Sequence, residues 1–295
     1  MPLVIRENVP LAPFTSFQVG GPARFFCSPK SGEEFKEALN FVRERNLPHF
    51  VLGKGTNLVF SDAGFNGLVI DMGEFNRITW EGEMVTAQCG ALLLDVVMQS
   101  VEKGFAGMQN LAGIPGTMGG GTYINAGAFE QELKDVVSEV FSLGVDGKEF
   151  RRDNAACGFG YRRSIFCGAG ELILESRMRL RPGGDSESLR GEMNATLAKR
   201  AEKQPLHLPN AGSMFKRPPG QYAGVLIQAA GLKGFRMGNA GISDKHANFT
   251  VNLGGATAQE IWDLTSEVIR RVKDQSGTTL EREVIFVGGF LPWPR

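Results

Sequence analysis

The segment that decides the fold reads GIPGTMGGGTYINAGAF and covers residues 113–129. It contains six glycines and one proline. Glycine loses backbone entropy in a regular element and proline removes a hydrogen-bond donor, so this composition predicts a loop. Glycines also let backbone N–H groups approach a ligand, and successive N–H groups in turns form an anion-binding concavity, which makes a diphosphate the natural ligand.

An ordinary surface loop is the alternative interpretation of this segment. Its apolar residues favour a buried backbone path instead, because surface loops are mostly polar. These residues are Ile114, Met118, Ile124 and Phe129.

Composition limits the classes of function. A chain of 295 residues exceeds the usual size of one domain, which predicts two or three domains. Glycine makes up 39 of the 295 residues, about 13%, against a usual share of roughly 7%, so several loops should bring backbone close to something. The 32 basic and 32 acidic residues balance, which excludes attraction to nucleic acid or to an anionic membrane.

Cysteine spacing and the N-terminus predict a reduced, cytoplasmic protein. The four cysteines lack paired metal-ligand spacing, so we expect small reduced hydrophobes and no metal site. The first residues lack the features of a signal peptide, and no apolar run reaches membrane-spanning length.

Hydrophobic periodicity predicts an α+β protein, because helices and strands occur in clusters without regular alternation. Helices are predicted at 31–46, 92–102, around 189–197, at 223–230 and from 257 onwards. Strands are predicted at 50–52, 58–60, 68–70, 84–88, 136–143, 149–150 and 172–181. A last strand, 280–287, is predicted to put Glu281, Glu283, Ile285 and Val287 on one face.

A second glycine turn, Gly53–Leu58, follows the strand at 50–52. It fails the dinucleotide fingerprint because Leu58 occupies the third glycine position and no helix pattern follows. It also fails the G-x-x-x-x-G-K-[ST] pattern because Lys54 precedes Gly55. The turn can still bind a phosphate through its N–H groups.

Eight ordered motifs over nearly the whole chain carry a family resemblance. They are TSFQVGGPA (15–23), LGKGTNLVFSDAGFNGLVI (52–70), GIPGTMGGGTYINAGAF (113–129), FGYRRSIF (159–166), AGSMFKRP (211–218), AGLKG (230–234), HANFTVN (246–252) and LEREV (280–284). Together they closely resemble the UDP-N-acetylenolpyruvoylglucosamine reductase family of peptidoglycan synthesis, in a compact form without the extra tyrosine loop.

The resemblance implies two FAD-binding subdomains of the vanillyl-alcohol-oxidase type and a C-terminal α+β substrate-binding domain. The expected boundaries are 1–75, 76–184 and 185–295, with the last strand a candidate to pack back on the first subdomain. NADPH would reduce the flavin, and the flavin would reduce the enolpyruvyl ether of the UDP-sugar. Covalent attachment is not expected, because no histidine lies between His49 and His207 to anchor the flavin.

The resemblance also implies the residues that hold FAD. They are Gly53, Lys54, Gly55, Thr56, Asn57, Leu58, Ala112, Gly113, Pro115, Gly116, Gly119, Gly120, Asn125 and Ala126.

The catalytic residues implied by the resemblance are Arg162, Ser213 and Glu283. Hydride arriving at the enolpyruvyl double bond leaves negative charge on the adjacent carboxylate, so the reaction needs a fixed cation and a proton source. Arg162 would bind that carboxylate. Ser213 would donate the proton, and Glu283 would polarise the intermediate. From the residues alone, a turn serine, a solvated arginine pair and a strand-edge charge are the plainer interpretations.

Substrate contacts are implied for Tyr161, Lys216, Arg217, His246 and Asn248. Arg163, Tyr222 and Lys233 are further candidates, whereas Phe215 and Phe249 are expected in the core. Two rival functions remain: a non-covalent flavin oxidase acting on a sugar or lactone, and a non-catalytic flavin-binding module. The sequence leaves the oligomeric state open and is compatible with a monomer.

Overall fold

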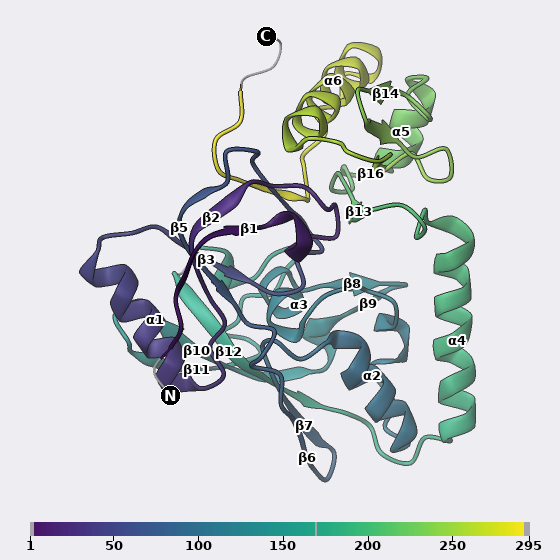
Figure 1. Ribbon diagram of the computed structural model, residues 1–295. Coiled ribbons are helices and arrows are strands. Elements are labelled where there is room, and N and C mark those ends of the chain that lie inside the picture. Colours follow the sequence, from purple (N-terminus) through teal and green to yellow (C-terminus); the bar gives the residue numbers. More distant parts are fainter. Residues whose placement is uncertain (1–2, 169, 292–295) are drawn as a thin grey trace. The chain divides into compact units, whose positions relative to one another are not determined.

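The computed structural model describes residues 3–168 and 170–291 (Figure 1). The chain divides into two compact units. Unit 1 consists of Met1–Ile5, Cys27–Lys54 and Val69–Arg200. Unit 2 consists of Arg6–Phe26, Gly55–Leu68 and Ala201–Arg295. Each unit combines helices with mainly antiparallel strands, which confirms the predicted α+β class.

The main sheet of unit 1 has five antiparallel strands in the order β11-β10-β12-β7-β6. The strands are β6 (Ile78–Glu81), β7 (Met84–Gln88), β10 (Val137–Gly144), β11 (Glu149–Asp153) and β12 (Glu171–Arg179). The predicted hairpin turn at Asp146-Gly147 joins β10 to β11, and Gly147 has the positive φ, 85°, that such a turn requires. Met178 and Leu180 of the predicted alternating strand are buried.

Among the described residues, unit 1 contains α-helices at three predicted positions and one in the segment predicted as a loop. They are α1 (Gly32–Glu44), α2 (Leu93–Glu102), α3 (Met118–Ile124) and α4 (Ser186–Lys203), whose last three residues belong to unit 2. Ser31 Oγ accepts the N–H of Glu34 at 3.2 Å and thereby caps α1. Short 3-10 turns lie at Gln109–Leu111, Leu133–Asp135 and Ile165–Cys167, and β8 (Gly127–Ala128) pairs with β9 (Gln131–Glu132).

The prediction that the whole 113–129 segment is a loop is wrong, because α3 occupies its centre. Glycine is a poor helix former, but α3 packs against β7 and β12, and this packing needs residues without side chains. A Cβ on Gly119 would lie 2.6 Å from Cβ of Cys89, and one on Gly121 would lie 2.8 Å from Cδ1 of Leu133. The expected burial holds for Met118, whereas Phe129 is 44% exposed.

A second sheet, of four strands, has the order β1-β2-β5-β3. Its strands are β1 (Arg6–Pro10), β2 (Pro22–Cys27), β3 (His49–Leu52) and β5 (Phe65–Asp71). The division between the units falls inside β5, after Leu68, so this strand belongs to both. A 3-10 turn at Ala12–Phe14 follows β1.

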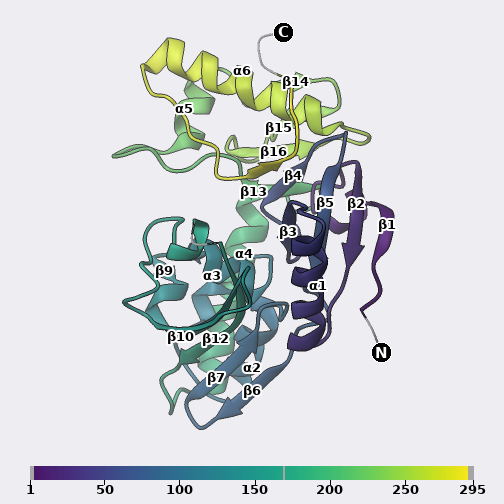
Figure 2. The same cartoon turned by 90° about the vertical axis from the view of Figure 1, so that its left-hand side faces the viewer.

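Unit 2 is built on a four-stranded antiparallel sheet with the order β13-β16-β15-β14. Its elements are β13 (Asn210–Ser213), α5 (Ala223–Ala229), β14 (Arg236–Met237), β15 (Ala240–Ile242), β16 (Phe249–Asn252) and α6 (Ala258–Ser276). Helix α6 packs on β14 and β15 and contacts α5 (Figure 2). The predicted capping box of α6 is confirmed, since Thr257 and Glu260 bind each other's backbone N–H groups.

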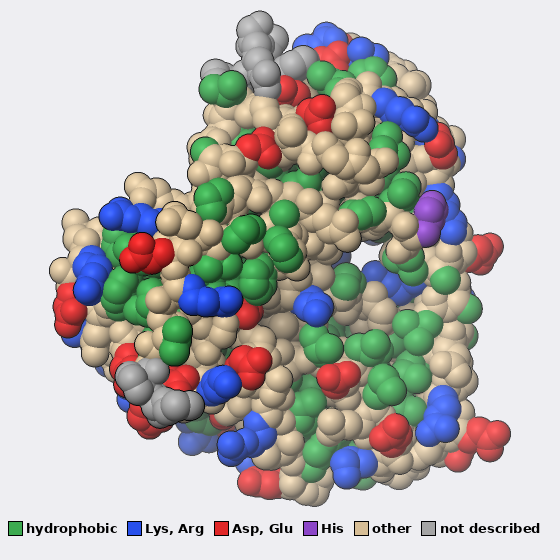
Figure 3. Space-filling view, viewed as in Figure 1, with side chains coloured by type: hydrophobic (Ala, Val, Ile, Leu, Met, Phe, Trp, Pro, Cys, Tyr) green, Lys and Arg blue, Asp and Glu red, His purple; other side chains and the backbone are tan. Residues whose placement is uncertain are grey.

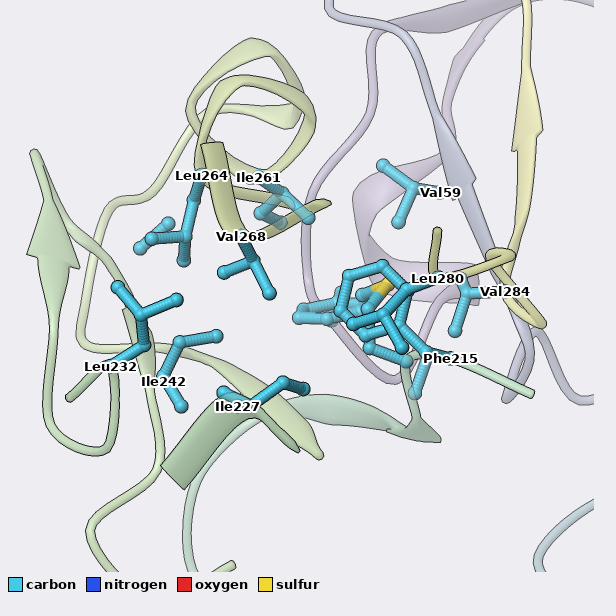
Figure 4. Packing of buried hydrophobic residues seen from close by; sticks show 14 of the residues in the cluster. Val59, Phe215, Ile227, Leu232, Ile242, Ile261, Leu264, Val268, Leu280 and Val284 are labelled. Atoms are coloured by element: carbon cyan, nitrogen blue, oxygen red, sulfur yellow. The ribbon is translucent and has the colours of Figure 1, made fainter. Parts of the chain in front are cut away.

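The core of unit 2 joins residues from both ends of the chain. Ile261, Leu264 and Val268 of α6 pack with Val59 and with Phe215 (Figure 4). The expectation that Phe215 and Phe249 are core residues is confirmed, because they are 1% and 3% exposed.

The predicted last strand is too long. Only β17 (Ile285–Val287) is a strand, and it pairs in parallel with β4 (Leu58–Phe60). The preceding residues pair instead with 214–216, so the chain changes partner before Ile285. The predicted common face is therefore wrong: Val287 is buried, but Ile285 is 38% exposed.

Candidate flavin and substrate site

Gly53, at the start of the glycine turn Gly53–Leu58, contacts the glycine-rich segment 113–129 within unit 1. A Cβ on Gly53 would lie 2.5 Å from Oγ1 of Thr117, so the backbone of this turn lies against the start of α3. Among the described residues, no intramolecular hydrogen-bond partner is found for several backbone N–H groups of these two segments. They belong to Gly53, Lys54, Gly113, Gly116 and Thr117. Unpaired N–H groups in a glycine-rich setting suit an anionic ligand.

The remaining residues of the glycine turn, Gly55–Leu58, belong to unit 2. A Cβ on Gly55 would lie 2.0 Å from the carbonyl oxygen of Phe14, which explains glycine at this position. The carbonyl of Gly55 accepts the N–H of Ser16 at 3.0 Å, and Ser16 Oγ donates to the carbonyl of Asn210 at 2.6 Å. Ser16 therefore ties this turn to the start of β13.

Asn125, which was predicted to bind the cofactor, holds the chain around the end of α3. It ends α3 in the left-handed conformation, with φ 49°, and is fully buried. Its Nδ2 donates to Glu132 at 3.1 Å and to the carbonyl of Gly160 at 3.0 Å, and its Oδ1 accepts the N–H of Lys134 at 2.9 Å. Both polar atoms of the side chain are thus used within the protein.

Arg200 is a candidate binding residue that the sequence analysis missed. One face of α4 follows residues 109–113: Glu192 accepts from Gln109, Thr196 donates to Asn110, and Arg200 lies on Gly113. A Cβ on Gly113 would be 2.8 Å from Cδ of Arg200. The four-residue spacing on a helix produces this row.

Arg200 differs from its neighbours in that row because no partner for its guanidinium is found among the described residues. Burial lowers the pKa of Arg200, as expected for a cation removed from water without an anion beside it. No local motif marks this residue in the sequence; its signal is only the helical spacing from Glu192.

Ser213 and Glu283 lie on neighbouring segments of unit 2. Ser213 ends β13, and no intramolecular hydrogen bond to its hydroxyl is found within the described part of the chain. The N–H of Glu283 donates to the carbonyl of Met214 at 2.8 Å. Asn57 accepts the N–H of Ile285 at 3.0 Å and donates from Nδ2 to the carbonyl of Glu283 at 3.4 Å. The glycine turn thus also contacts the Glu283 segment.

Asn248 fixes the backbone that follows Ser213. Its Oδ1 accepts the N–H of Phe215 at 3.0 Å, its Nδ2 donates to the carbonyl of Phe215 at 2.9 Å, and its own carbonyl accepts the N–H of Met214 at 2.7 Å. The side chain is 8% exposed. The amide is therefore engaged with backbone.

His246 is partly engaged as well. Its Nδ1 accepts the N–H of Asn248 at 3.1 Å, and its ring packs edge-on against Phe249. Burial lowers the pKa of His246, and the nearby Lys233 lowers it further, so the ring is neutral near pH 7. With Nδ1 accepting, Nε2 carries the proton.

The remaining predicted substrate residues include exposed side chains. Tyr161 is 51% exposed, and the Arg162 guanidinium lies 5.2 Å from its ring centre. Lys216 forms an ion pair with Glu281, and Arg217 stacks 4.1 Å from the ring centre of Tyr222. The remaining candidates, Arg163 and Lys233, are exposed.

Arg162 belongs to unit 1 and adopts an unusual backbone conformation. Its φ is 52°, a left-handed value that costs an ordinary residue about 1 kcal/mol or more. Its Nη2 donates to the carbonyl of Gly127 at 3.2 Å, which lies near the end of the glycine-rich segment 113–129. Strained backbone of this kind occurs at functional sites.

Charges of both signs are interspersed on the face shown in Figure 3. No helix among the described residues is long and apolar enough to cross a membrane, and these residues contain no group of three or more His, Cys, Asp or Glu side chains placed to hold a metal. The four cysteines are free; Cys27, Cys89 and Cys157 are buried, whereas Cys167 is exposed.

Comparison with known proteins assigns the two parts of the chain. Residues 23–151 match the family model described as an FAD binding domain, and residues 204–287 match the C-terminal domain of UDP-N-acetylenolpyruvoylglucosamine reductase. The reductase of Clostridium perfringens is 39% identical over 286 residues, covering 96% of this chain and 93% of the relative. The Streptococcus thermophilus reductase is 40% identical over 284 residues, with the same coverage.

A solved structure agrees with this assignment. The UDP-N-acetylenolpyruvylglucosamine reductase of Thermus caldophilus is similar with a TM-score of 0.82 and 33% identity, over 98% of this chain and 100% of that chain. Both the sequence and the fold match over almost the full length. The chain therefore belongs to the UDP-N-acetylenolpyruvoylglucosamine reductase family.

Proposed function

We propose that this chain is an FAD-containing, NADPH-dependent oxidoreductase that reduces UDP-N-acetylenolpyruvoylglucosamine to UDP-N-acetylmuramate in peptidoglycan precursor synthesis. The observation that carries this function is the similarity to reductases of this family over 96% of the chain, including both the FAD binding domain and the C-terminal domain. We place the reaction in the cytoplasm, where both NADPH and nucleotide sugars are available.

The described residues fit a non-covalently held FAD. Among the described residues, the N–H groups of Gly53, Lys54, Gly116 and Thr117 have no intramolecular partner and suit its diphosphate, and the Arg200 guanidinium adds a positive charge that also has no partner there. When bound, FAD supplies the hydride transfer from NADPH to the enolpyruvyl group. We assign the remaining predicted residues of 53–58 and 112–126 to the same site, with Asn125 acting through the backbone that it holds.

Three side chains act on the substrate in this proposal. Arg162 binds the enolpyruvyl carboxylate, where a planar guanidinium stabilises growing negative charge. Ser213 donates a proton to the carbon next to the one that receives hydride, because a carbanion-like intermediate is basic enough to take a proton from a hydroxyl. Glu283 polarises the same intermediate.

The nucleotide diphosphate is bound, in the same proposal, by Lys216 and Arg217, with Tyr161 and the Nε2 proton of His246 as further contacts. Asn248 contributes indirectly, because its amide holds Phe215 and thereby the loop that carries Ser213.

The direct test is anaerobic spectroscopy of the FAD-loaded protein. We expect NADPH to bleach the flavin absorbance and UDP-N-acetylenolpyruvoylglucosamine to restore it without oxygen. Rapid recovery with oxygen and no response to the UDP-sugar would identify an oxidase. Protein that stays colourless after addition of FAD would contradict any flavin-dependent function.

Removal of the Arg200 charge should weaken FAD selectively. We expect Arg200→Met to weaken FAD binding to the apoprotein by about tenfold to a hundredfold, since a hydrogen bond to a charged group is worth about 1.5–3 kcal/mol. Riboflavin, which lacks the diphosphate, should bind both proteins equally. Quenching of flavin fluorescence measures both affinities.

The matched control for this prediction is Lys199→Met, which removes the exposed neighbouring charge on α4. This variant should bind FAD like the wild type. Equal weakening of FAD and riboflavin by Arg200→Met would assign Arg200 a purely structural role.

A further inference from the structure

Arg282 lies between the two glutamates of the LEREV motif and has an unusual environment. Its Nε donates to Thr265 Oγ1 at 3.0 Å, and its Nη2 donates to Ser266 Oγ at 2.6 Å and to the carbonyl of Trp262 at 3.3 Å. The guanidinium also stacks 4.1 Å from the ring centre of Trp262 and lies 5.3 Å from that of Phe286. Helix α6 thus supplies every hydrogen-bond acceptor found for this side chain among the described residues.

No carboxylate of the described residues pairs with this guanidinium. Burial lowers the pKa of Arg282 to about 10. Two aromatic rings and neutral oxygens therefore replace an ion pair, an arrangement that suits the flat, weakly hydrated guanidinium better than a lysine ammonium. Because all these contacts run to α6, they hold the Arg282 side chain in one direction from its backbone.

The backbone around Arg282 is held in register with the Ser213 loop. Arg282 forms an isolated antiparallel bridge with Phe215. On either side of it, the carbonyl of Glu281 accepts the N–H of Lys216 at 2.9 Å, and the N–H of Glu283 donates to Met214 at 2.8 Å. Phe215 is in the core cluster of unit 2 (Figure 4). Because residues opposite each other in an antiparallel pair point to the same face, the Arg282 side chain points to this inner face as well.

Successive side chains of an extended backbone point to opposite faces, so the side chains next to Arg282 point to the other face. The ion pair between Glu281 and Lys216 marks that face. Glu283 occupies the corresponding position on the other side of Arg282. The direction of the Glu283 carboxylate thus depends on Arg282 staying anchored to α6.

We propose that Arg282 is a positioning residue for the reaction: its anchorage to Trp262, Thr265 and Ser266 of α6 sets the direction of the Glu283 carboxylate relative to Ser213. This inference rests on the proposed function of Glu283. Arg282 itself contacts neither hydride nor proton in this scheme.

The test compares the two half-reactions of the FAD-loaded full chain by anaerobic stopped flow. Arg282→Met should leave flavin reduction by NADPH unchanged and slow reoxidation by UDP-N-acetylenolpyruvoylglucosamine by about tenfold to a hundredfold, the effect of a displacement of roughly 1 Å. In a Glu283→Gln background, the same change should slow reoxidation less than about twofold, because the group it positions is already absent.

Milder and matched variants keep the test decisive if Arg282→Met does not fold. Ser266→Ala removes one acceptor and should slow only reoxidation, by about threefold to tenfold. Arg271→Met removes an arginine that belongs to α6 itself and stacks 4.5 Å from the ring centre of Phe235, and it should change neither half-reaction.

Three results would overturn the inference. They are an unchanged reoxidation rate in both Arg282→Met and Ser266→Ala, equal slowing of both half-reactions, and full additivity with Glu283→Gln. A wild-type protein that the UDP-sugar does not reoxidise would instead refute the proposed function, and this is measured separately.

Discussion

Replacing Ser213 by alanine is expected to leave flavin reduction by NADPH at its wild-type rate and to slow reoxidation by UDP-N-acetylenolpyruvoylglucosamine by about 10²–10⁴-fold, the usual contribution of a positioned proton donor. The substitution should remove the hydroxyl without disturbing the surrounding structure. No hydrogen bond to the hydroxyl is found among the described residues, and Asn248 holds the following backbone independently of it. Anaerobic stopped-flow absorbance separates the two half-reactions.

Ser213→Cys provides the control, because a thiol can also donate a proton. We expect it to recover part of the activity lost in Ser213→Ala. Unimpaired turnover of the alanine variant would remove Ser213 from the proton-donating role, while leaving the flavin chemistry of the family in place.

Two neighbouring glycines of α3 should respond to alanine in opposite directions. Gly119→Ala should destabilise the apoprotein by about 1–3 kcal/mol or more, since its Cβ would lie 2.6 Å from Cβ and 3.0 Å from the carbonyl oxygen of Cys89. Gly120→Ala should stabilise it by about 0.5–1 kcal/mol, because its Cβ would meet only Thr117 Oγ1, at 3.6 Å, and alanine is the better helix former.

Urea unfolding of the two apoproteins, with equal m-values, gives the comparison. The two variants share residue type, helix and substitution, so their difference isolates packing. Similar effects of both substitutions would contradict the close approach of α3 to Cys89.

The sequence predicted the ends of the elements better than their interiors. Caps at Ser31 and Thr257 and the turn at Asp146-Gly147 are local signals, and the structure has them where predicted. The loop prediction for the glycine-rich segment is wrong because propensity favours a loop, whereas close packing on Cys89 and Leu133 favours a helix of residues without side chains. Local propensity gave no account of that tertiary requirement.

Local sequence patterns identify only part of the candidate site. The motifs led to Ser213, Glu283 and the glycine turns, but the alternation pattern in 280–287 was misleading, since the chain changes hydrogen-bond partner within it. Arg200 and Arg282 carry no recognisable local pattern. Their significance depends on what they contact, or fail to contact, after the chain has folded.

The pairing of β17 with β4 has a consequence for biosynthesis. Unit 1 uses no residue beyond Arg200, so a ribosome-bound chain can complete that unit early. Unit 2 must wait, because Phe17, Val19 and Val59 share their core with Leu280 and Val284. During this interval the nascent polypeptide presents unburied apolar surface. Chaperones that cover such surface should assist its production most while the final 95 residues are being translated.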